Sequence, residues 1–365
     1  MNKVRVGVIG IGGMGGAHAQ HILHGKIPGA ELTAVADIAP DLAKKYPDQK
    51  AFTSGEDMIR SGTVDAILIA TPHYSHTPLG IAGLQQGLHV LVEKPISVHK
   101  ADCEKLIAAR RDTKQVFAAM FNQRTDPTYK KIRHLITSGE LGTVRRINWI
   151  VTNWFRSDAY YGSGGWRATW AGEGGGVLLN QCPHNLDLWQ WLFGMPKRIR
   201  AFCAFGKYHP IEVEDDVTAY FEYANGATGA FITSTGEAPG TNRLEIAAEQ
   251  GKVVLENGHL HFTRNEIPTS EFCRTTKERF SAPPTWDISI PVSGGGGQHV
   301  EIMQNFIDAI LKGTPLIAPA EEGLHSVELA NAMLFSSVSE KTIELPLDSA
   351  AYAAWLYKVS QPKSA

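Results

Sequence analysis

The spacing of hydrophobic positions changes near residue 125, and the change predicts two kinds of sheet in one chain. Before it, short apolar runs alternate with amphipathic stretches of helical spacing. Apolar strands separated by helices are typical of a parallel sheet that is covered on both faces. We expect strands at 4–10, 31–37, 64–71, 89–93 and 116–121, with helices between them, for example at 16–23, 78–86 and 100–111.

After residue 125, apolar and polar positions alternate over longer segments, which favours a largely antiparallel sheet with helices on one face. Two of these segments flank Asn225-Gly226, a dipeptide typical of a tight β-hairpin. The expected strands are 143–155, 198–206, 216–223, 228–235, 243–248 and 252–263, with helices at 126–138, 298–312 and 321–338. The chain is thus predicted to be α/β, with a first domain at 1–123, a second at 124–345 and a C-terminal tail at 346–365.

Residues 4–15, VRVGVIGIGGMG, predict a strand that leads directly into a glycine-rich turn and a helix. Without side chains in the way, backbone N–H groups can approach a pyrophosphate, and the helix directs the positive end of its dipole at the anion. A glycine-rich turn in some other doubly wound domain is the alternative. We expect a dinucleotide site at Gly10, Gly12, Gly13, Met14 and Gly15.

Asp37 ends the second expected strand, 27 residues after Gly10. This is near the spacing at which a carboxylate binds the adenosine ribose. A carboxylate accepts from a 2′-hydroxyl and repels a 2′-phosphate, and the next residue, Ile38, offers no basic partner. Asp37 therefore favours NAD over NADP.

Three further expected strands end in polar residues. Parallel strands bring their carboxyl ends to one edge of the sheet, so these residues should converge with the glycine turn on one crevice. We assign most of them to cofactor binding and Gln123 to the substrate. The cofactor set is Thr71, Pro72, His73, His76, Glu93, Lys94 and Asn122.

Lys94 is also the first candidate for catalysis. Pro95 holds it in an extended backbone at the end of its strand, so its ammonium can donate to a substrate hydroxyl as that oxygen becomes an alkoxide. Partial burial would lower its pKa and help it to exchange protons. The alternative is an ordinary surface lysine at a strand end.

Residues 172–194, GEGGGVLLNQCPHNLDLWQWLFG, carry Asn180, His184 and Asp187 at helical spacing. Pro183 should mark the first turn of the helix, with Asn180 just before it. The helix dipole then disfavours the imidazolium of His184, and a neutral imidazole can act as a general base. The alternative is a polar helix face with a satisfied histidine. HxxxH spacing is absent, so no metal site is expected.

Tryptophan is concentrated in one region, with six of eight between residues 149 and 191. Trp154 and Arg156, and Trp166 and Arg167, lie in a stretch rich in Gly, Ser, Asp and Tyr that predicts a loop. An indole ring stacks on the apolar faces of a sugar while arginine binds its hydroxyls. We expect at least one of these tryptophans to contact carbohydrate. The glycine run at 293–297 predicts a flexible loop that folds over the site.

Composition narrows the class of protein. The 365 residues are 43% hydrophobic and 20% charged with a net charge of −2, which disfavours nucleic acid as a partner. No apolar stretch reaches transmembrane length, and the first strand begins within a few residues of Met1, so we expect a cytoplasmic protein without a signal peptide. The cysteines are scattered, which favours reduced thiols, and Cys182 is expected to be a small packing residue.

With these features assembled, the chain resembles the glucose–fructose oxidoreductase/inositol dehydrogenase (Gfo/Idh/MocA) family of NAD(P)-dependent oxidoreductases over essentially its whole length. The resemblance is carried by the glycine turn, by Ala70–His76 (ATPHYSH), by Glu93-Lys94-Pro95, by the glycine-led helix with His184, and by segments 299–313 and 321–337. It implies a Rossmann domain, doubly wound, followed by an α/β domain with an open, mostly antiparallel sheet. The outer face of that sheet would build a homodimer or homotetramer.

The resemblance also implies roles for individual residues. Lys94 and His184 match the family's catalytic lysine and histidine. Many members carry Asp where this chain has Asn180, which can hold a hydroxyl but cannot take its proton. His184 would then act with less electrostatic help, or Lys94 would share the task. Trp166 and Arg167 are assigned to the cofactor. The substrate set is Lys94, Gln123, Trp154, Arg156, Asn180 and His184.

The expected activity is NAD-dependent oxidation of a secondary hydroxyl on a sugar, glycoside or cyclitol. Three alternatives stay open: a redox-neutral NAD-dependent glycosidase, a glycoside 3-dehydrogenase that feeds a separate lyase, and a non-catalytic dinucleotide-binding regulator. A phosphate or nucleotide on the substrate is also open, with Arg124, Arg156 and Arg167 as the basic candidates.

Overall fold

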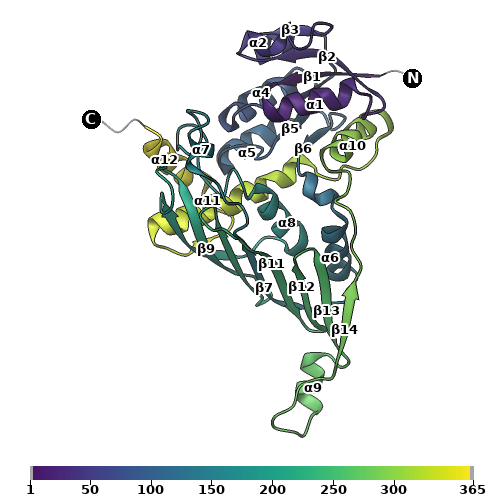
Figure 1. Ribbon diagram of the computed structural model, residues 1–365, viewed down its shortest axis with the longest axis vertical. Helices are drawn as coiled ribbons and strands as arrows, with labels where there is room; N and C mark the ends of the chain where they lie inside the picture. The colour runs from purple at the N-terminus through teal and green to yellow at the C-terminus, as the bar shows by residue number, and fades with distance from the viewer. Residues whose placement is uncertain (1–2, 362–365) are drawn as a thin grey trace.

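The computed structural model describes residues 3–361, which form two sheets, each with a hydrophobic core of its own (Figure 1). The first sheet is parallel throughout, as predicted, in the order β3-β2-β1-β4-β5-β6. Its strands are β1 Val4–Ile9, β2 Ala30–Ala36, β3 Lys50–Phe52, β4 Ala66–Ile69, β5 His89–Val92 and β6 Phe117–Ala119. The pattern missed β3, because it is a short, largely exposed edge strand.

Helices cover both faces of this sheet. Proline begins α2, and the side chains of Ser54 and His99 accept from backbone N–H groups at the starts of α3 and α5. α1 begins within the glycine turn itself, three residues earlier than expected. The helices are α1 Gly13–Leu23, α2 Pro40–Ala43, α3 Gly55–Arg60, α4 His76–Gln85 and α5 Lys100–Ala108, with a 3₁₀ turn η1 at His73–Ser75.

The second sheet is mostly antiparallel, as predicted, in the order β14-β13-β12-β11-β7-β10-β9-β8-β15. One inner pair, β7 and β10, is parallel. The expected hairpin at Asn225-Gly226 joins β9 to β10. The strands are β7 Val144–Val151, β8 Arg198–Phe205, β9 Glu214–Glu222, β10 Thr228–Ser234, β11 Asn242–Ala248, β12 Gly251–Glu256, β13 His259–Asn265, β14 Thr285–Ile290 and β15 Ile343–Glu344.

The structure corrects several expected boundaries in this sheet. The single strand expected at 252–263 is two strands, because Asn257 and Gly258 both have positive φ (50° and 75°) and turn the chain back. β7 ends at Val151, so residues 152–155 leave the sheet. The pattern also missed β14 and the helix α9 Thr269–Thr275, which forms the narrow tip of the molecule in Figure 1.

The tail expected from residue 346 is instead largely a helix, α12 Ser349–Val359. Asp348 caps it by accepting from the backbone N–H groups of Ala350 and Ala351. Tyr352 and Leu356 are buried in the core of the second sheet, so packing rather than local pattern holds this helix. Residues 362–365 of the expected tail lie outside the described residues.

The expected division at residue 123 also differs from the way the cores are built. Ile302, Met303 and Phe306 lie on α10 Gln298–Lys312, in the segment assigned to the second domain, yet they pack in the core of the first sheet. Ala320, in the 3₁₀ turn η3 Ala320–Glu322, joins the same core. The chain therefore returns to the first sheet after building the second.

Within residues 3–361, helices pack on one face of the second sheet and leave the other uncovered. Along β7, Ile147, Trp149 and Val151 are buried, while Asn148 and Ile150 point to the opposite face. The remaining elements are η2 Asn122–Thr125, α6 Pro127–Thr137, α7 Asp158–Tyr161, α8 Pro183–Phe193 and α11 Gly323–Ser339. In the part of the chain that the structure describes, none of the helices combines the length and apolar character needed to cross a bilayer.

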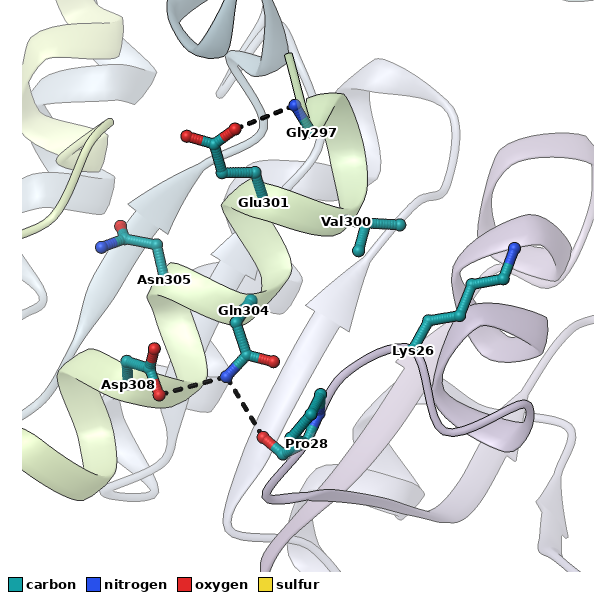
Figure 2. A pocket seen from close by; sticks show the side chains of 8 residues that line it. All are labelled: Lys26, Pro28, Gly297, Val300, Glu301, Gln304, Asn305 and Asp308. Atoms are coloured by element: carbon teal, nitrogen blue, oxygen red, sulfur yellow. Dashed lines mark hydrogen bonds between the residues drawn. The ribbon is translucent and has the colours of Figure 1, made fainter.

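A surface hollow of about 540 Å³ lies between α10 and the turn that follows α1 (Figure 2). Gln304 closes one side of it by donating to the carbonyl oxygen of Pro28 at 3.2 Å and to Asp308 at 3.1 Å. The residues that line this hollow include none of the predicted site residues.

Candidate active site

The glycine turn has the geometry of an open anion cradle. Gly10 has φ +82°, and a Cβ on Gly15 would lie 1.7 Å from the carbonyl oxygen of Gly10, so the strand and helix approach each other closely. A Cβ on Gly12 or Gly13 would meet no atom within 4 Å. No side chain caps the N-terminus of α1. Its N–H groups are therefore accessible to an anion such as a pyrophosphate. Met14, in the same turn, is exposed.

Asp37 ties the end of β2 to this turn. One carboxylate oxygen accepts from the N–H of Ile11 at 2.9 Å, and the other accepts from the N–H of Ala39 at 2.9 Å. Each oxygen keeps a further lone pair for a ligand hydroxyl. The carboxylate is thus held beside the cradle, and its orientation is fixed before any ligand binds.

Two buried polar atoms at the strand ends are unsatisfied. Thr71 Oγ1 and Asn122 Oδ1 have no hydrogen-bond partner within residues 3–361. Such groups are costly to bury unless a ligand or water completes them. Together with the open cradle and Asp37, they fit a dinucleotide lying along the carboxyl edge of the sheet.

His76 lies at this edge between two backbone carbonyl oxygens. Its Nδ1 lies 2.8 Å from the carbonyl oxygen of Pro95 and its Nε2 lies 2.8 Å from that of Thr71. A neutral imidazole carries a single N–H, so one of these nitrogens donates to its backbone oxygen. His76 thus links the loop after β4, which also carries Pro72 and His73, to the loop after β5.

The glycine run at 293–297 is fastened next to Asn122. The backbone N–H of Gln298 donates to Thr125 Oγ1 at 2.9 Å, and the Gln298 side chain accepts from Asn122 at 2.6 Å. Gly296 fits against the backbone of Thr125, where a Cβ would lie 2.2 Å from its carbonyl oxygen. One end of this loop is thus anchored to η2, which also carries Gln123.

Lys94 follows β5 and reaches toward α8. Its Nζ donates to the carbonyl oxygen of Asn180 at 3.0 Å. Burial lowers the pKa of Lys94 from its usual value, and the carboxylates of Glu93 and Glu173 partly oppose that effect. The strand end and the segment before α8 are therefore in direct contact, although they lie 86 residues apart in the chain.

Glu93 belongs to a buried cluster that the sequence did not indicate. Its carboxylate lies 2.7 Å from Nε2 of His18 on α1 and accepts from the N–H of Lys94 at 3.1 Å. The ring of His18 lies 5.5 Å from that of His299 on α10. Burial alone would raise the pKa of Glu93, but the hydrogen bond to His18 and the nearby cationic groups lower it to about 2. Glu93 is thus a permanent carboxylate beneath Lys94.

His184 occupies the first turn of α8, directly after Pro183, as the sequence predicts. Its ring lies edge-on to Phe121 with centroids 6.3 Å apart, and its Nδ1 is buried without a partner among the described residues. Burial, followed by the charge of Lys94, lowers the pKa of His184 to about 3. The imidazole is therefore neutral at ordinary pH, as a general base must be.

Asn180 contacts a carboxylate that sequence reasoning overlooked. Its side-chain amide donates to Glu173, whose other oxygen accepts from the N–H of Ala168 at 2.7 Å. Asn180 Oδ1 accepts from the hydroxyl of Tyr160 at 3.4 Å. The only hint in the sequence was the position of Glu173 within the glycine-led motif.

Tyr160 on α7 is a second residue that the sequence did not single out. The guanidinium groups of Arg156 and Arg167 lie 5.0 and 4.8 Å from its ring centre, and Arg167 donates to its hydroxyl at 2.9 Å. Trp154 lies 5.6 Å from Arg156, and Trp166 lies 4.7 Å from Arg167. The loop assigned to cofactor and substrate therefore presents aromatic rings and two cations beside Asn180.

Arg124 is a correction to the basic candidates. It is buried, and its guanidinium forms a two-pronged ion pair with Asp187, at 2.7 and 2.5 Å. Glu322 pairs with the same group. Arg124 therefore has no free charge for a substrate phosphate, and Asp187 has a structural role as its partner. Cys182 is buried, with its sulfur 2.9 Å from the hydroxyl of Thr233.

Two family models match the chain. The model described as an oxidoreductase family with an NAD-binding Rossmann fold matches residues 4–121, and the model of the GFO/IDH/MocA C-terminal domain matches residues 129–254. The first match contains the glycine turn, Asp37 and Lys94, and the second contains Asn180 and His184.

Two curated relatives match nearly the whole length of the chain. The chain is 31% identical over 345 residues to inositol 2-dehydrogenase of Rubrobacter xylanophilus, covering 92% of this chain and 91% of that protein. It is 22% identical over 397 residues to levoglucosan dehydrogenase of Pseudarthrobacter phenanthrenivorans, covering 96% and 100%. Among solved structures, WlbA dehydrogenase from Bordetella pertussis, in complex with NADH and UDP-GlcNAcA, matches with a TM-score of 0.79 and 26% identity over 95% of this chain and 100% of that one.

Proposed function

Because the chain belongs to the GFO/IDH/MocA family of oxidoreductases, we propose that it is an NAD-dependent dehydrogenase acting on a secondary hydroxyl of a sugar, glycoside or cyclitol. Relatives named inositol 2-dehydrogenase and levoglucosan dehydrogenase support this class of substrate. The observation that supports the proposal is the contact of Lys94 with the segment that leads into α8, the helix on which His184 lies. Lys94 donates to the carbonyl oxygen of Asn180 just before α8, and burial, followed by the charge of Lys94, lowers the pKa of His184.

His184 is the base of the proposed reaction. Its imidazole is neutral because burial disfavours the charged form, so it can take the proton of the substrate hydroxyl. Lys94 donates a hydrogen bond to the same oxygen and stabilises the negative charge that develops there. Asn180 positions the hydroxyl through its amide, without exchanging a proton. When bound, the nicotinamide supplies the hydride acceptor.

The residues that would hold the dinucleotide line the carboxyl edge of the first sheet. The N–H groups of the turn from Gly10 to Gly15 suit the pyrophosphate, and Asp37 suits the adenosine ribose. Thr71 and Asn122 each keep an unsatisfied oxygen on the same edge. Because Asp37 brings a negative charge to the ribose position, we propose NAD rather than NADP as the cofactor.

The loop that contains α7 is the proposed contact surface for the sugar. Trp154 and Tyr160 offer ring faces for apolar C–H groups. Arg156 and Gln123 can hydrogen-bond to hydroxyls. Arg156 donates only to neighbouring carbonyl oxygens, including that of Phe155 at 2.8 Å, and its Nε is buried without a partner among the described residues. These unused donors support a ligand with several oxygen atoms.

The uncovered face of the second sheet supports self-association. One row of outward side chains runs in register across it, from Phe202 through Thr218 and Ile232 to Ile150. Phe202 is 62% exposed, and Tyr220 in the next row is 45% exposed. An apolar sheet face of this kind is normally covered by a partner. We propose that two or four copies pair through it.

Replacing either reacting group tests the proposed activity. We expect His184→Ala and Lys94→Ala each to lower turnover by about 10² to 10⁴-fold on a panel of monosaccharides, inositols and aryl glycosides, because each removes a proton donor or acceptor at the reacting oxygen. NAD binding, followed by tryptophan fluorescence, should persist. Hydride transfer at the wild-type rate in either variant, measured by stopped flow, would contradict the assignment.

His134→Ala and Lys105→Ala are matched controls, since both side chains are exposed and lie on helices away from the strand ends. The same panel separates the alternative activities. Accumulation of NADH indicates a net dehydrogenase, whereas product formation without NADH indicates redox-neutral chemistry. Binding of NAD without turnover of any compound in the panel would favour a regulatory protein.

A further inference from the structure

Glu173 is a buried carboxylate at the centre of the site that the proposed reaction does not use directly. Its side chain is 2% exposed. One oxygen accepts from the N–H of Ala168, and the other accepts from the side chain of Asn180 and lies 3.9 Å from the guanidinium of Arg167. Burying a carboxylate is costly unless nearby groups favour its charged form. The protein therefore retains a negative charge here at a cost in stability.

Asn180 links this carboxylate to Lys94. Its amide donates to Glu173, and its backbone oxygen accepts from Lys94 Nζ at 3.0 Å. An asparagine carries no charge of its own. The negative charge that faces Lys94 from the second domain therefore comes from Glu173.

The charges around Lys94 oppose the effect of burial. Burial lowers the pKa of Lys94 most, Arg167 lowers it further, and Glu93 and Glu173 raise it. Glu93 already shares its carboxylate with His18. The titratable groups that face Lys94 or Glu173 are His73, His76, Glu93, Arg167, Cys182, His184, Glu214 and His299.

Glu173 also fixes the loop that carries Trp166 and Arg167. Ala168 has φ +54°, a left-handed conformation that is unfavourable for a residue with a side chain. Its N–H is the group that Glu173 accepts from at 2.7 Å. Gly172 packs so tightly under this loop that a Cβ would lie 1.9 Å from the carbonyl oxygen of Trp166. The Glu173 side chain thus holds the loop in place, orients the amide of Asn180 and adds a negative charge near Lys94.

We propose that Glu173 is a positioning residue that supplies a second negative charge to this site, in addition to that of Glu93, keeping Lys94 an ammonium ion and orienting Asn180. The catalytic role of the Glu173 charge rests on the proposed dehydrogenase function. Its effect on the ionisation of Lys94 does not. In the reaction His184 takes the hydroxyl proton, Lys94 keeps its proton and hydrogen-bonds to the alkoxide, and Glu173 stays ionised throughout.

The direct test is the ionisation of Lys94 in Glu173→Gln. The fraction of Lys94 that reacts with an acylating reagent is followed against pH by peptide mass spectrometry, without substrate. Removing a negative charge favours the neutral amine, so the midpoint should shift to lower pH than in the wild type. An unchanged midpoint in a folded variant would overturn the proposal. This readout needs no turnover, so it stands even if the proposed activity fails.

A second pair of variants separates charge from structure. The double variant Glu173→Gln/Asn180→Asp places a carboxylate at residue 180 instead of residue 173. The Lys94 midpoint should then move back toward the wild-type value. If the double variant has the same Lys94 midpoint as Glu173→Gln, Glu173 affects Lys94 only through the local structure, and the proposal is wrong. Asn180→Asp alone should raise the midpoint, which keeps the test open if Glu173→Gln does not fold. No shift in that variant would also count against the proposal.

Glu212→Gln is the matched control. Glu212 accepts from the backbone N–H of Trp170 at 3.3 Å, so it holds the same loop without contacting Lys94 or Asn180. Its loss should leave the Lys94 midpoint unchanged. Once a substrate is known, Glu173→Gln should also lower kcat and move the alkaline limb of its pH profile to lower pH, and Glu173→Gln/Asn180→Asp should restore both.

Discussion

At the residue scale, burial is the main influence on the chemistry of this site. The same desolvation lowers the pKa of His184 to about 3 and lowers the pKa of Lys94, while it raises the pKa of Glu173. Because the folded-state pKa of His184 is depressed, its imidazole is neutral at every pH well above 3. Loss of activity in mildly acidic solution would therefore come from another group. Neighbouring charges then raise or lower the pKa of each of these residues to a different extent.

Cofactor choice is also decided at one residue, Asp37. We expect the wild type to bind NAD more tightly than NADP, and Asp37→Asn to reduce that preference by about tenfold or more, since the repulsion of a 2′-phosphate is removed. The amide can still accept from Ile11, so the glycine turn should keep its shape. Fluorescence titration with both cofactors measures the ratio. Asp41→Asn, an exposed acid on α2, serves as the control.

A wild type that binds NADP more tightly would overturn the assignment of Asp37. A ratio that is the same in Asp37→Asn and the wild type would show that other groups set the preference.

At the element scale, α8 is positioned by a buried ion pair rather than by its own sequence. Asp187, one turn after His184, pairs with Arg124, which follows β6. The pair fixes α8 against η2, and Glu322 adds a third charge from η3. The helix that carries the proposed base is thus anchored directly to the carboxyl edge of the first sheet.

Asp187→Asn should destabilise the protein by roughly 3 kcal/mol, because it leaves a buried guanidinium with only the partly exposed Glu322. Urea unfolding followed by tryptophan fluorescence measures the loss. Asp57→Asn removes an exposed partner of Arg60 on α3 and should change the midpoint much less. Equal midpoints for Asp187→Asn and the wild type would show that the pair does not hold α8.

At the scale of the whole molecule, the second sheet leaves one face without a covering layer. Ile232 and Ile150 lie opposite each other at its centre, in the parallel pair of β10 and β7. Burying them against a second copy removes apolar surface from water, whereas a monomer leaves them partly exposed. The arrangement favours pairing of sheets over pairing of the nucleotide-binding parts.

Ile232→Glu should convert the assembly to monomers, because a carboxylate at the centre of the interface would be buried without a partner. Size-exclusion chromatography with light scattering reports the mass. Thr285→Glu adds the same charge on the edge strand β14, where the residue is exposed, and should leave the mass unchanged. A monomeric wild type, or an unchanged mass for Ile232→Glu, would contradict pairing through this face.

The sequence alone determined the features that depend on near neighbours. Glycine spacing and apolar strands specify the turn at Gly10 and the parallel sheet around it, and Pro183 begins α8 because its ring cannot fit farther inside a helix. Alternation predicted the mostly antiparallel sheet. Boundaries that depend on packing were wrong, including the expected tail, where buried Tyr352 and Leu356 hold a helix in place.

Only the tertiary structure decided which charges are free. Arg124 looks like any basic residue in the sequence, but Asp187 neutralises it from 63 positions away. Glu93 contacts His18, which lies 75 residues away in the sequence, and Lys94 contacts Asn180, which lies 86 residues away. Local spacing contains no information about such partners, because they are brought together by the packing of two cores. The pKa values that set the chemistry therefore depend on the fold, whereas the residue types that could perform it were visible in the chain.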